Sequence, residues 1–171
     1  LYPTSHVHAQ MVRAEASAAE IDSASAALAG PERIVQARSI LPLGPEADRV
    51  LIALSEATYQ PRYLRLRALR ALGFCKTERG YAYLESLLKR HDSSPAMLRR
   101  VVSSMARAFG ERAIPALTPM LVHELPRVRQ ATAYALLALR SERADRALES
   151  WSKTERSAAL LRAFRVRKKA R

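Results

Sequence analysis

Residues 64–73 read LRLRALRALG, and this stretch decides the fold of the 171-residue chain. Two later stretches, LRRVVSSMAR at 98–107 and VRQATAYALL at 128–137, begin with the same pair of an aliphatic residue and an arginine. The pair recurs at intervals of 34 and 30 residues. Self-similarity at a nearly constant period is the signature of stacked repeats, so these stretches are predicted to be copies of one structural unit.

A second marker follows each stretch and keeps the same phase. It is a Glu-Arg pair at 78–79, 111–112 and 142–143, and a leucine lies six residues beyond each Glu. Each unit therefore reads as two helices, because apolar residues recur at helical spacing and a carboxylate suits the positive end of the second helix. The expected helix pairs are 61–72 with 78–90, 95–109 with 111–123, and 127–139 with 142–151.

Proline marks the beginning of each first helix, at Pro61, Pro95 and Pro126. Proline suits a first helical turn, because its missing N–H has no intrahelical partner there. Pro119 lies one turn deeper in a predicted second helix and cannot donate to the carbonyl of Pro115. We therefore expect that helix to bend or open near residues 115–119, with the irregularity facing solvent or a ligand.

The pattern of residues 64–73, together with ERAIPAL at 111–117, resembles HEAT repeats, particularly the short bacterial kind. The resemblance covers 61–151 well, and 32–58 resemble a degraded fourth unit in which Pro42 and Pro45 replace the usual turn. It implies an all-α, right-handed α-solenoid of three to four helix pairs with capping helices at both ends. It further implies a binding scaffold whose family has no common catalytic residues.

The two ends differ from the array expected at 31–151. Residues 1–30 are Ala-rich and acidic, with an apolar residue every seven positions from Val7 to Leu28. They are predicted to form a helical cap, or alternatively a docking or coiled-coil helix.

Residues 152–171 are predicted to form a C-terminal capping helix and a basic tail that begins at Arg165. Ser152 and Glu155 fit a capping box at the start of that helix. The side chains expected to face inward are Ala158, Leu161 and Phe164.

The formal net charge of +13 is unevenly distributed. Residues 1–60 hold four arginines against seven acidic residues, whereas 61–171 hold 25 basic and nine acidic residues. From 156 to 171 there are seven basic residues and no acidic one. Such a field attracts nucleic acid, an anionic membrane surface or an acidic protein.

The candidate partner-binding residues are basic side chains of the second helices and of the C-terminal segment. Helical-wheel geometry places three arginines opposite the leucine stripe, where the HEAT resemblance implies a ladder on the concave face: Arg79, Arg112 and Arg143. The alternative is that these Glu-Arg pairs are solvent-exposed residues at a helix end with no role in binding. Flanking this side are Arg90, His123 and Arg146. The C-terminal candidates are Arg162, Arg165, Arg167, Lys168 and Lys169.

Three further arginines belong to the repeat pattern itself. They are Arg65, Arg99 and Arg129, and they are expected to pair with neighbouring repeats.

Motifs for catalysis are missing from the sequence. It contains no Gly-rich phosphate loop, no Gly-x-Ser-x-Gly and no His-Glu-x-x-His. We therefore expect no enzyme activity, no catalytic residue, no cofactor and no metal. His6 and His8 would share a metal only in an extended stretch, Cys75 is expected to be a small half-buried residue, and Trp151 is expected in the core.

These features favour a non-enzymatic scaffold or adaptor that binds an acidic protein partner through its concave face and basic C-terminal end. The alternative is a nucleic-acid-associated module, such as a component of a ribonucleoprotein particle. No run reaches the roughly 18 apolar residues of a membrane span. The oligomeric state stays open.

Location is predicted from the resemblance and from the first residue. The units resemble those of exported HEAT-repeat proteins of GC-rich bacteria, which favours the cell envelope or periplasm, with a mitochondrial or cytoplasmic location as the alternatives. Because the chain begins at Leu1, we expect an upstream segment to contain the targeting signal.

Overall fold

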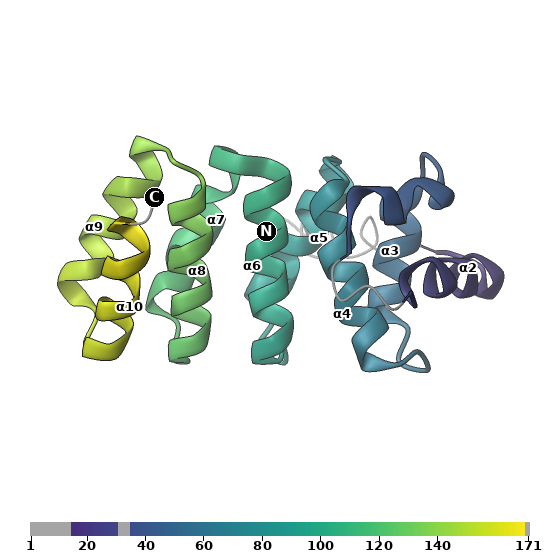
Figure 1. Cartoon of the computed structure of the whole chain (residues 1–171). Coiled ribbons are helices and arrows are strands. Elements are labelled where there is room, and N and C mark those ends of the chain that lie inside the picture. The colour runs from purple at the N-terminus through teal and green to yellow at the C-terminus, as the bar shows by residue number, and fades with distance from the viewer. Residues whose placement is uncertain (1–14, 31–34, 170–171) are drawn as a thin grey trace, which may run out of the picture. The chain divides into compact units, whose positions relative to one another are not determined.

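The computed structural model describes residues 15–30 and 35–169. Within these ranges the chain is all-α, its helices pack in successive pairs and no strand occurs, so the predicted fold class is confirmed. The chain divides into two compact units, Leu1–Ser86 and Leu87–Arg171. The helices of both units are labelled in Figure 1.

The first unit contains helices that precede and include the first clear repeat. They are α2 (Ala18–Leu28), the 3₁₀ helix η1 (Ala37–Leu43), α3 (Ala47–Glu56), α4 (Arg62–Ala71), the 3₁₀ turn η2 (Leu72–Phe74) and most of α5 (Glu78–Lys89). Helix α2 begins with a capping box, in which Ser17 Oγ accepts from the Glu20 amide and the Glu20 carboxylate accepts from the Ser17 amide. It packs against α3 and α4.

The degraded repeat has a regular second helix, and its described residues from 35 onwards contain no regular first one. Helix α3 buries an apolar stripe that includes Val50, Leu51 and Leu54. Before it, η1 contains Pro42, which lacks the N–H that an α-helical ladder requires. The local chemistry of proline therefore accounts for the irregular half of this unit.

The second unit contains the remaining repeats. Its helices are α6 (Pro95–Phe109), η3 (Gly110–Ala113), α7 (Ile114–Leu117), η4 (Thr118–Val122), α8 (Pro126–Ala138), α9 (Glu142–Thr154) and α10 (Ala158–Lys169). Helix α8 packs against α6 on one side and α10 on the other (Figure 1), so α10 occupies the position of a further first helix.

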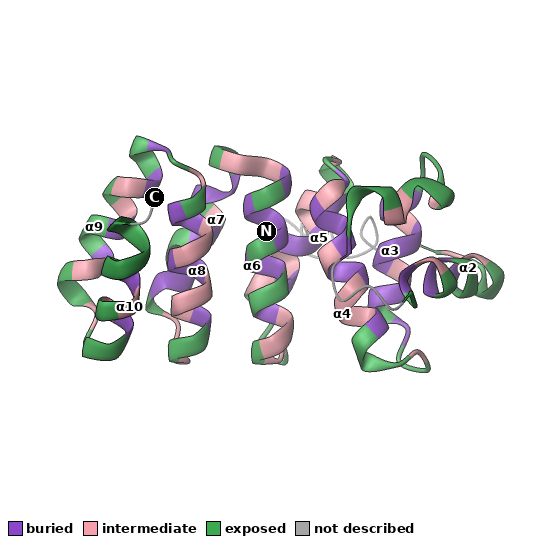
Figure 2. Cartoon of the chain, in the orientation of Figure 1, coloured by how far each residue is buried: buried purple, intermediate pink, exposed green. Residues whose placement is uncertain are grey.

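The core of this unit lies between successive helices. Helix α6 buries Val101, Val102 and Met105, and α8 buries Ala133 and Leu136. Buried and exposed residues alternate along both helices, as each turn passes from the core to the solvent (Figure 2). Burial of one stripe on each helix is what stabilises the stacking, because an isolated helix pair leaves apolar surface in water.

The second helix of the middle repeat is broken at the two prolines, as predicted. It consists of η3, the single α-helical turn α7 and η4. Pro115 and Pro119 are both exposed, so the irregular face is turned to solvent. The Thr118 hydroxyl donates to the carbonyl of Ile114 at 2.8 Å, which satisfies one acceptor in the irregular stretch.

Of three predictions for the C-terminal segment, the capping box and the tail are wrong, and the inward-facing set is confirmed only for Phe164. Ser152 and Thr154 finish α9, and the residue that caps α10 is Ser157, whose Oγ accepts from the Leu160 amide at 3.3 Å. The buried side chains of α10 are Leu160 and Phe164, whereas Ala158 is exposed and Leu161 is half-buried. Residues 165–169 continue the helix rather than forming a tail.

Candidate functional site

The predicted arginine of the first unit, Arg79, is held in an internal ion-pair network. Its Nη1 lies 2.9 Å from Glu46 Oε2 and 3.3 Å from Asp48 Oδ1. The Asp48 carboxylate is buried and also accepts from the Thr77 hydroxyl at 2.7 Å. Arg79 therefore forms ion pairs that connect α5 to the start of α3.

Several predicted residues of the second unit also have internal partners. Arg90 forms two hydrogen bonds of 3.0 Å with the Asp92 carboxylate, and these lower the pKa of Asp92. The amide of Leu125 donates to the His123 ring at 3.1 Å, and Arg146 lies 3.8 Å from Glu142. Two other candidates of this set, Arg112 and Arg143, are exposed.

The C-terminal candidates gather on one helix. Arg162, Arg165, Arg167, Lys168 and Lys169 are all exposed residues of α10. The Arg167 guanidinium lies over the ring of Tyr134 on α8, 4.7 Å from its centroid. This cation–π contact ties the basic surface of α10 to α8.

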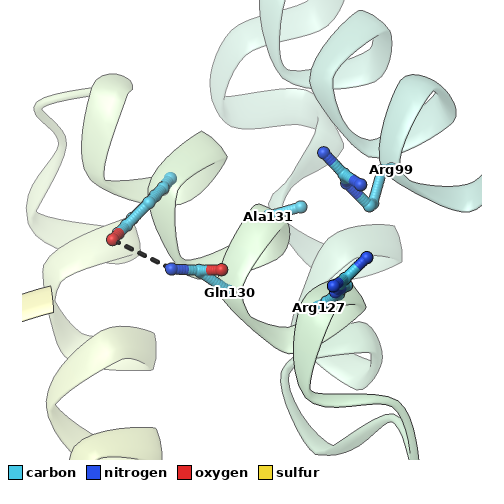
Figure 3. A pocket seen from close by; sticks show the side chains of 5 residues that line it. Arg99, Arg127, Gln130 and Ala131 are labelled. Atoms are coloured by element: carbon cyan, nitrogen blue, oxygen red, sulfur yellow. Dashed lines mark hydrogen bonds between the residues drawn. The ribbon is translucent and has the colours of Figure 1, made fainter. Parts of the chain in front are cut away.

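A hollow of about 410 Å³ opens on the surface formed by α6 and α8 (Figure 3). Its lining residues are Arg99, Arg127, Gln130, Ala131 and Tyr134. Figure 3 shows the two arginines on one side of Ala131 and the Gln130 amide on the other, where it donates to the Tyr134 hydroxyl at 3.2 Å. No acidic residue is among the described residues that line this hollow.

The sequence did not single out this hollow. Arg99 was expected to pair with a neighbouring repeat, but it is exposed and lines the hollow instead. Arg127 was not identified, although it lies in the first turn of α8, where a cation opposes the helix dipole. An exposed arginine in the first turn of a predicted helix was the sequence feature from which Arg127 could have been identified as a candidate binding residue.

The expected structural role is confirmed for Arg129. Its guanidinium donates to both carboxylate oxygens of Glu155 and to the carbonyls of His123 and Glu124. The bonds from Arg129 to the Glu155 carboxylate lower the pKa of Glu155. The equivalent Arg65 has a buried Nε without a hydrogen-bond partner in the described part of the chain.

Other side chains considered for chemistry are structural. Cys75 is buried, and desolvation raises its thiol pKa to about 11, so the thiolate form is suppressed. Trp151 is in the core, as predicted, with its ring 5.2 Å from that of Phe164 in a T-shaped arrangement.

Residues 15–30 and 35–169 contain no group of three or more His, Cys, Asp or Glu side chains placed to hold a metal ion. Nor does any helix in these ranges have the length and hydropathy to cross a membrane. His6 and His8 lie outside the described residues.

Comparison with known families gave one match. The model of HEAT repeats matches residues 47–136 and, overlapping them, 87–165. Searches of curated proteins and of solved structures found no significant match. The matched segment runs from α3 to α10 and includes every residue that lines the hollow.

Proposed function

The chain belongs to the HEAT-repeat family, whose members are generally protein-interaction scaffolds, and we propose that it is a non-enzymatic scaffold for an acidic protein partner. The observation that carries this proposal is the charge of its second unit. Residues 87–171 contain 19 Lys and Arg against seven Asp and Glu. Complementary charge accelerates encounter with an acidic partner and selects against basic ones.

The basic surface of α10 is proposed as the main contact. It consists of Arg162, Arg165, Arg167, Lys168 and Lys169, and residues 156–169 contain no acidic side chain. Among the second-helix candidates, Arg79, Arg90 and Arg146 already lie close to carboxylates of this chain. Arg143 is proposed as an additional contact on the second helices of the repeats; Arg112 is exposed too, but it already has an interaction within this chain.

A substitution on α10 tests this proposal more cleanly than a truncation. Removal of the chain after Ala163 would also remove Phe164, which packs on Trp151. The variant R162Q/R165Q/K168Q/K169Q removes four charges and leaves both Phe164 and the Arg167–Tyr134 contact in place. Its matched control is R62Q/K76Q/K89Q/R107Q, which removes four charges from other exposed positions.

The measurement is fluorescence polarisation with a fluorescein-labelled peptide of alternating Glu and Ala, and with a labelled DNA duplex, over a series of salt concentrations. We expect the α10 variant to lose about tenfold more peptide affinity than its control, because four exposed ion pairs contribute a few tenths of a kcal/mol each. Tighter binding of the duplex than of the peptide at equal salt would overturn the proposal in favour of a nucleic-acid-associated module.

Localisation in a bacterial cell envelope is a separate proposal. It is supported by the likeness of the repeats to those of exported HEAT-repeat proteins. The sequence encoded upstream of Leu1 tests it, because a hydrophobic signal stretch would support export and an Arg-rich amphipathic stretch would point to an organelle.

A further inference from the structure

The two arginines of the hollow differ from most arginines described above. Arg79, Arg90 and Arg129 each donate to a carboxylate of this chain. In the described part of the chain, by contrast, neither Arg99 nor Arg127 has a carboxylate within ion-pairing distance. They come from adjacent helices that pack together, so both guanidinium groups border one recess.

A guanidinium group presents a planar fork of donors that matches the two oxygens of a carboxylate. Arginine has no acceptor, so the complementary ligand must supply oxygen atoms. A pair of such forks beside one hollow therefore suits one or two acidic side chains. Exposure of both arginines keeps them hydrated in the free protein, and a ligand carboxylate would replace that water.

The other lining residues suit the backbone of a peptide. Ala131 contributes a small apolar surface, which leaves room in the hollow for a neighbouring chain. The Gln130 amide nitrogen donates one hydrogen bond to the Tyr134 hydroxyl. The second N–H and the carbonyl oxygen of Gln130 and the O–H of Tyr134 can form further hydrogen bonds. Peptide N–H and C=O groups can use that capacity, as they do in most peptide-binding sites.

Nucleic acid fits the hollow less well than a peptide. Single-stranded nucleic acid binds by stacking its bases on exposed aromatic faces. The only aromatic residue among the described lining residues is Tyr134, and the Arg167 guanidinium lies over its ring. The face that Arg167 covers is closed to a base.

We propose that the hollow between α6 and α8 is a subsite for the carboxylate side chains of an acidic peptide segment, which Arg99 and Arg127 hold between them. This inference rests on the proposed scaffold function and names a recognition site for it. The subsite lies on α6 and α8, the first helices of their repeats, whereas the sequence predicted a binding surface on the second helices. It places the acidic segment next to Arg167 and thus beside the basic surface of α10.

The first test removes the guanidinium groups of Arg99 and Arg127. The variant R99Q/R127Q is compared with K89Q/R156Q, which removes the same charge from exposed residues that do not line the hollow. The probes are the labelled peptide of alternating Glu and Ala and a neutral analogue with Gln in place of Glu. We expect R99Q/R127Q to bind the Glu peptide at least about tenfold more weakly than K89Q/R156Q, because glutamine cannot form the charge-assisted, bidentate hydrogen bonds that a guanidinium group forms with a carboxylate.

The second test fills the site without removing an arginine. Ala131→Glu places a tethered carboxylate in the hollow, where it competes with the peptide, and Ala131→Gln is the control of nearly equal volume. We expect A131E to lose peptide binding and A131Q to lose much less of it. Circular dichroism and urea unfolding of all four variants check that each one is folded.

The outcomes separate the subsite from the scaffold function. Peptide binding that weakens equally in R99Q/R127Q and K89Q/R156Q would overturn the subsite and leave the scaffold function standing. No binding of the Glu peptide to the native chain at low salt would overturn both. Loss of duplex DNA binding in R99Q/R127Q, with peptide binding unchanged, would assign the arginines to phosphate and overturn the proposal.

Discussion

Arg129 and Glu155 form a bidentate ion pair that joins the start of α8 to the turn between α9 and α10. The distances are 2.7 Å from Nε to Oε2 and 3.0 Å from Nη2 to Oε1. The Glu155 side chain is only 2 % exposed, and it also accepts from the Trp151 indole at 3.2 Å and from the Ser157 amide at 2.8 Å. The pair therefore holds the last helix of the described chain on the repeat before it.

Removal of one partner of this ion pair should destabilise the protein strongly. We expect Glu155→Ala to lower the free energy of unfolding by about 3 kcal/mol, because it leaves a partly buried guanidinium without its carboxylate. Urea unfolding followed by circular dichroism measures the change. The control is Glu149→Ala on α9, whose exposed pair with Lys153 spans 3.8 Å and should contribute less than about 1 kcal/mol. Equal losses in the two variants would contradict the structural role of the pair.

Acid should destabilise the fold through two glutamates. A hydrogen bond from Arg49, together with those from Ser17, lowers the pKa of Glu20 from its usual 4.5 to about 2, and the bonds from Arg129 lower the pKa of Glu155. A lowered pKa in the folded state means that the unfolded state binds protons first. The stabilisation is therefore fully present above about pH 5 and is lost as the pH falls towards 2.

Urea unfolding at a series of pH values measures this effect. The free energy of unfolding of the native chain should fall with decreasing pH below about 5. In the variant Glu20→Gln/Glu155→Gln that fall should be smaller, because both titrating groups are gone. An identical pH slope in the native chain and the variant would show that other groups govern acid unfolding.

The Cys75 thiol should react slowly while the chain is folded. Burial raises its pKa from 9.0 to about 11, which lowers the thiolate fraction at a pH below 9 by about a hundredfold. Alkylation with iodoacetamide near pH 8, followed by mass spectrometry, should therefore be at least about a hundredfold slower in buffer than in concentrated urea. Comparable rates in the two solvents would mean that the thiol is accessible in the folded chain.

A glycine at position 140 should stabilise the second unit. Arg140 follows α8 with a φ of 54°, the left-handed region in which a Cβ atom is strained. Since the Arg140 side chain is exposed, Arg140→Gly should raise the free energy of unfolding by roughly 1 kcal/mol. The control is Arg140→Ala, which removes the same charge but keeps Cβ and should bring no gain. Thermal unfolding of both variants distinguishes backbone strain from the effect of charge.

The sequence by itself determined the helix pairs of 61–151, because their signals are local. Apolar periodicity and proline position act over a few residues, so α6 begins at Pro95, as predicted, and α8 begins at Pro126, one residue before the predicted start. The break at Pro115 and Pro119 was predictable for the same reason. The start of α10 was not, because the sequence favoured a cap at Ser152, whereas in the structure Ser152 lies within α9 and Ser157 caps α10.

The role of each arginine depends on how the helices around it pack. Arg99 and Arg129 occupy the same position in the repeat pattern, yet Arg129 is paired with Glu155, whereas Arg99 borders an open hollow. Glu155 lies 26 residues beyond Arg129, and only the packing of α8 and α9 brings the two together. Arg127 likewise becomes part of a site only because α8 packs against α6. Ion pairs and hollows depend on distances between segments that are far apart in the chain, and a local repeat pattern carries no information about those distances.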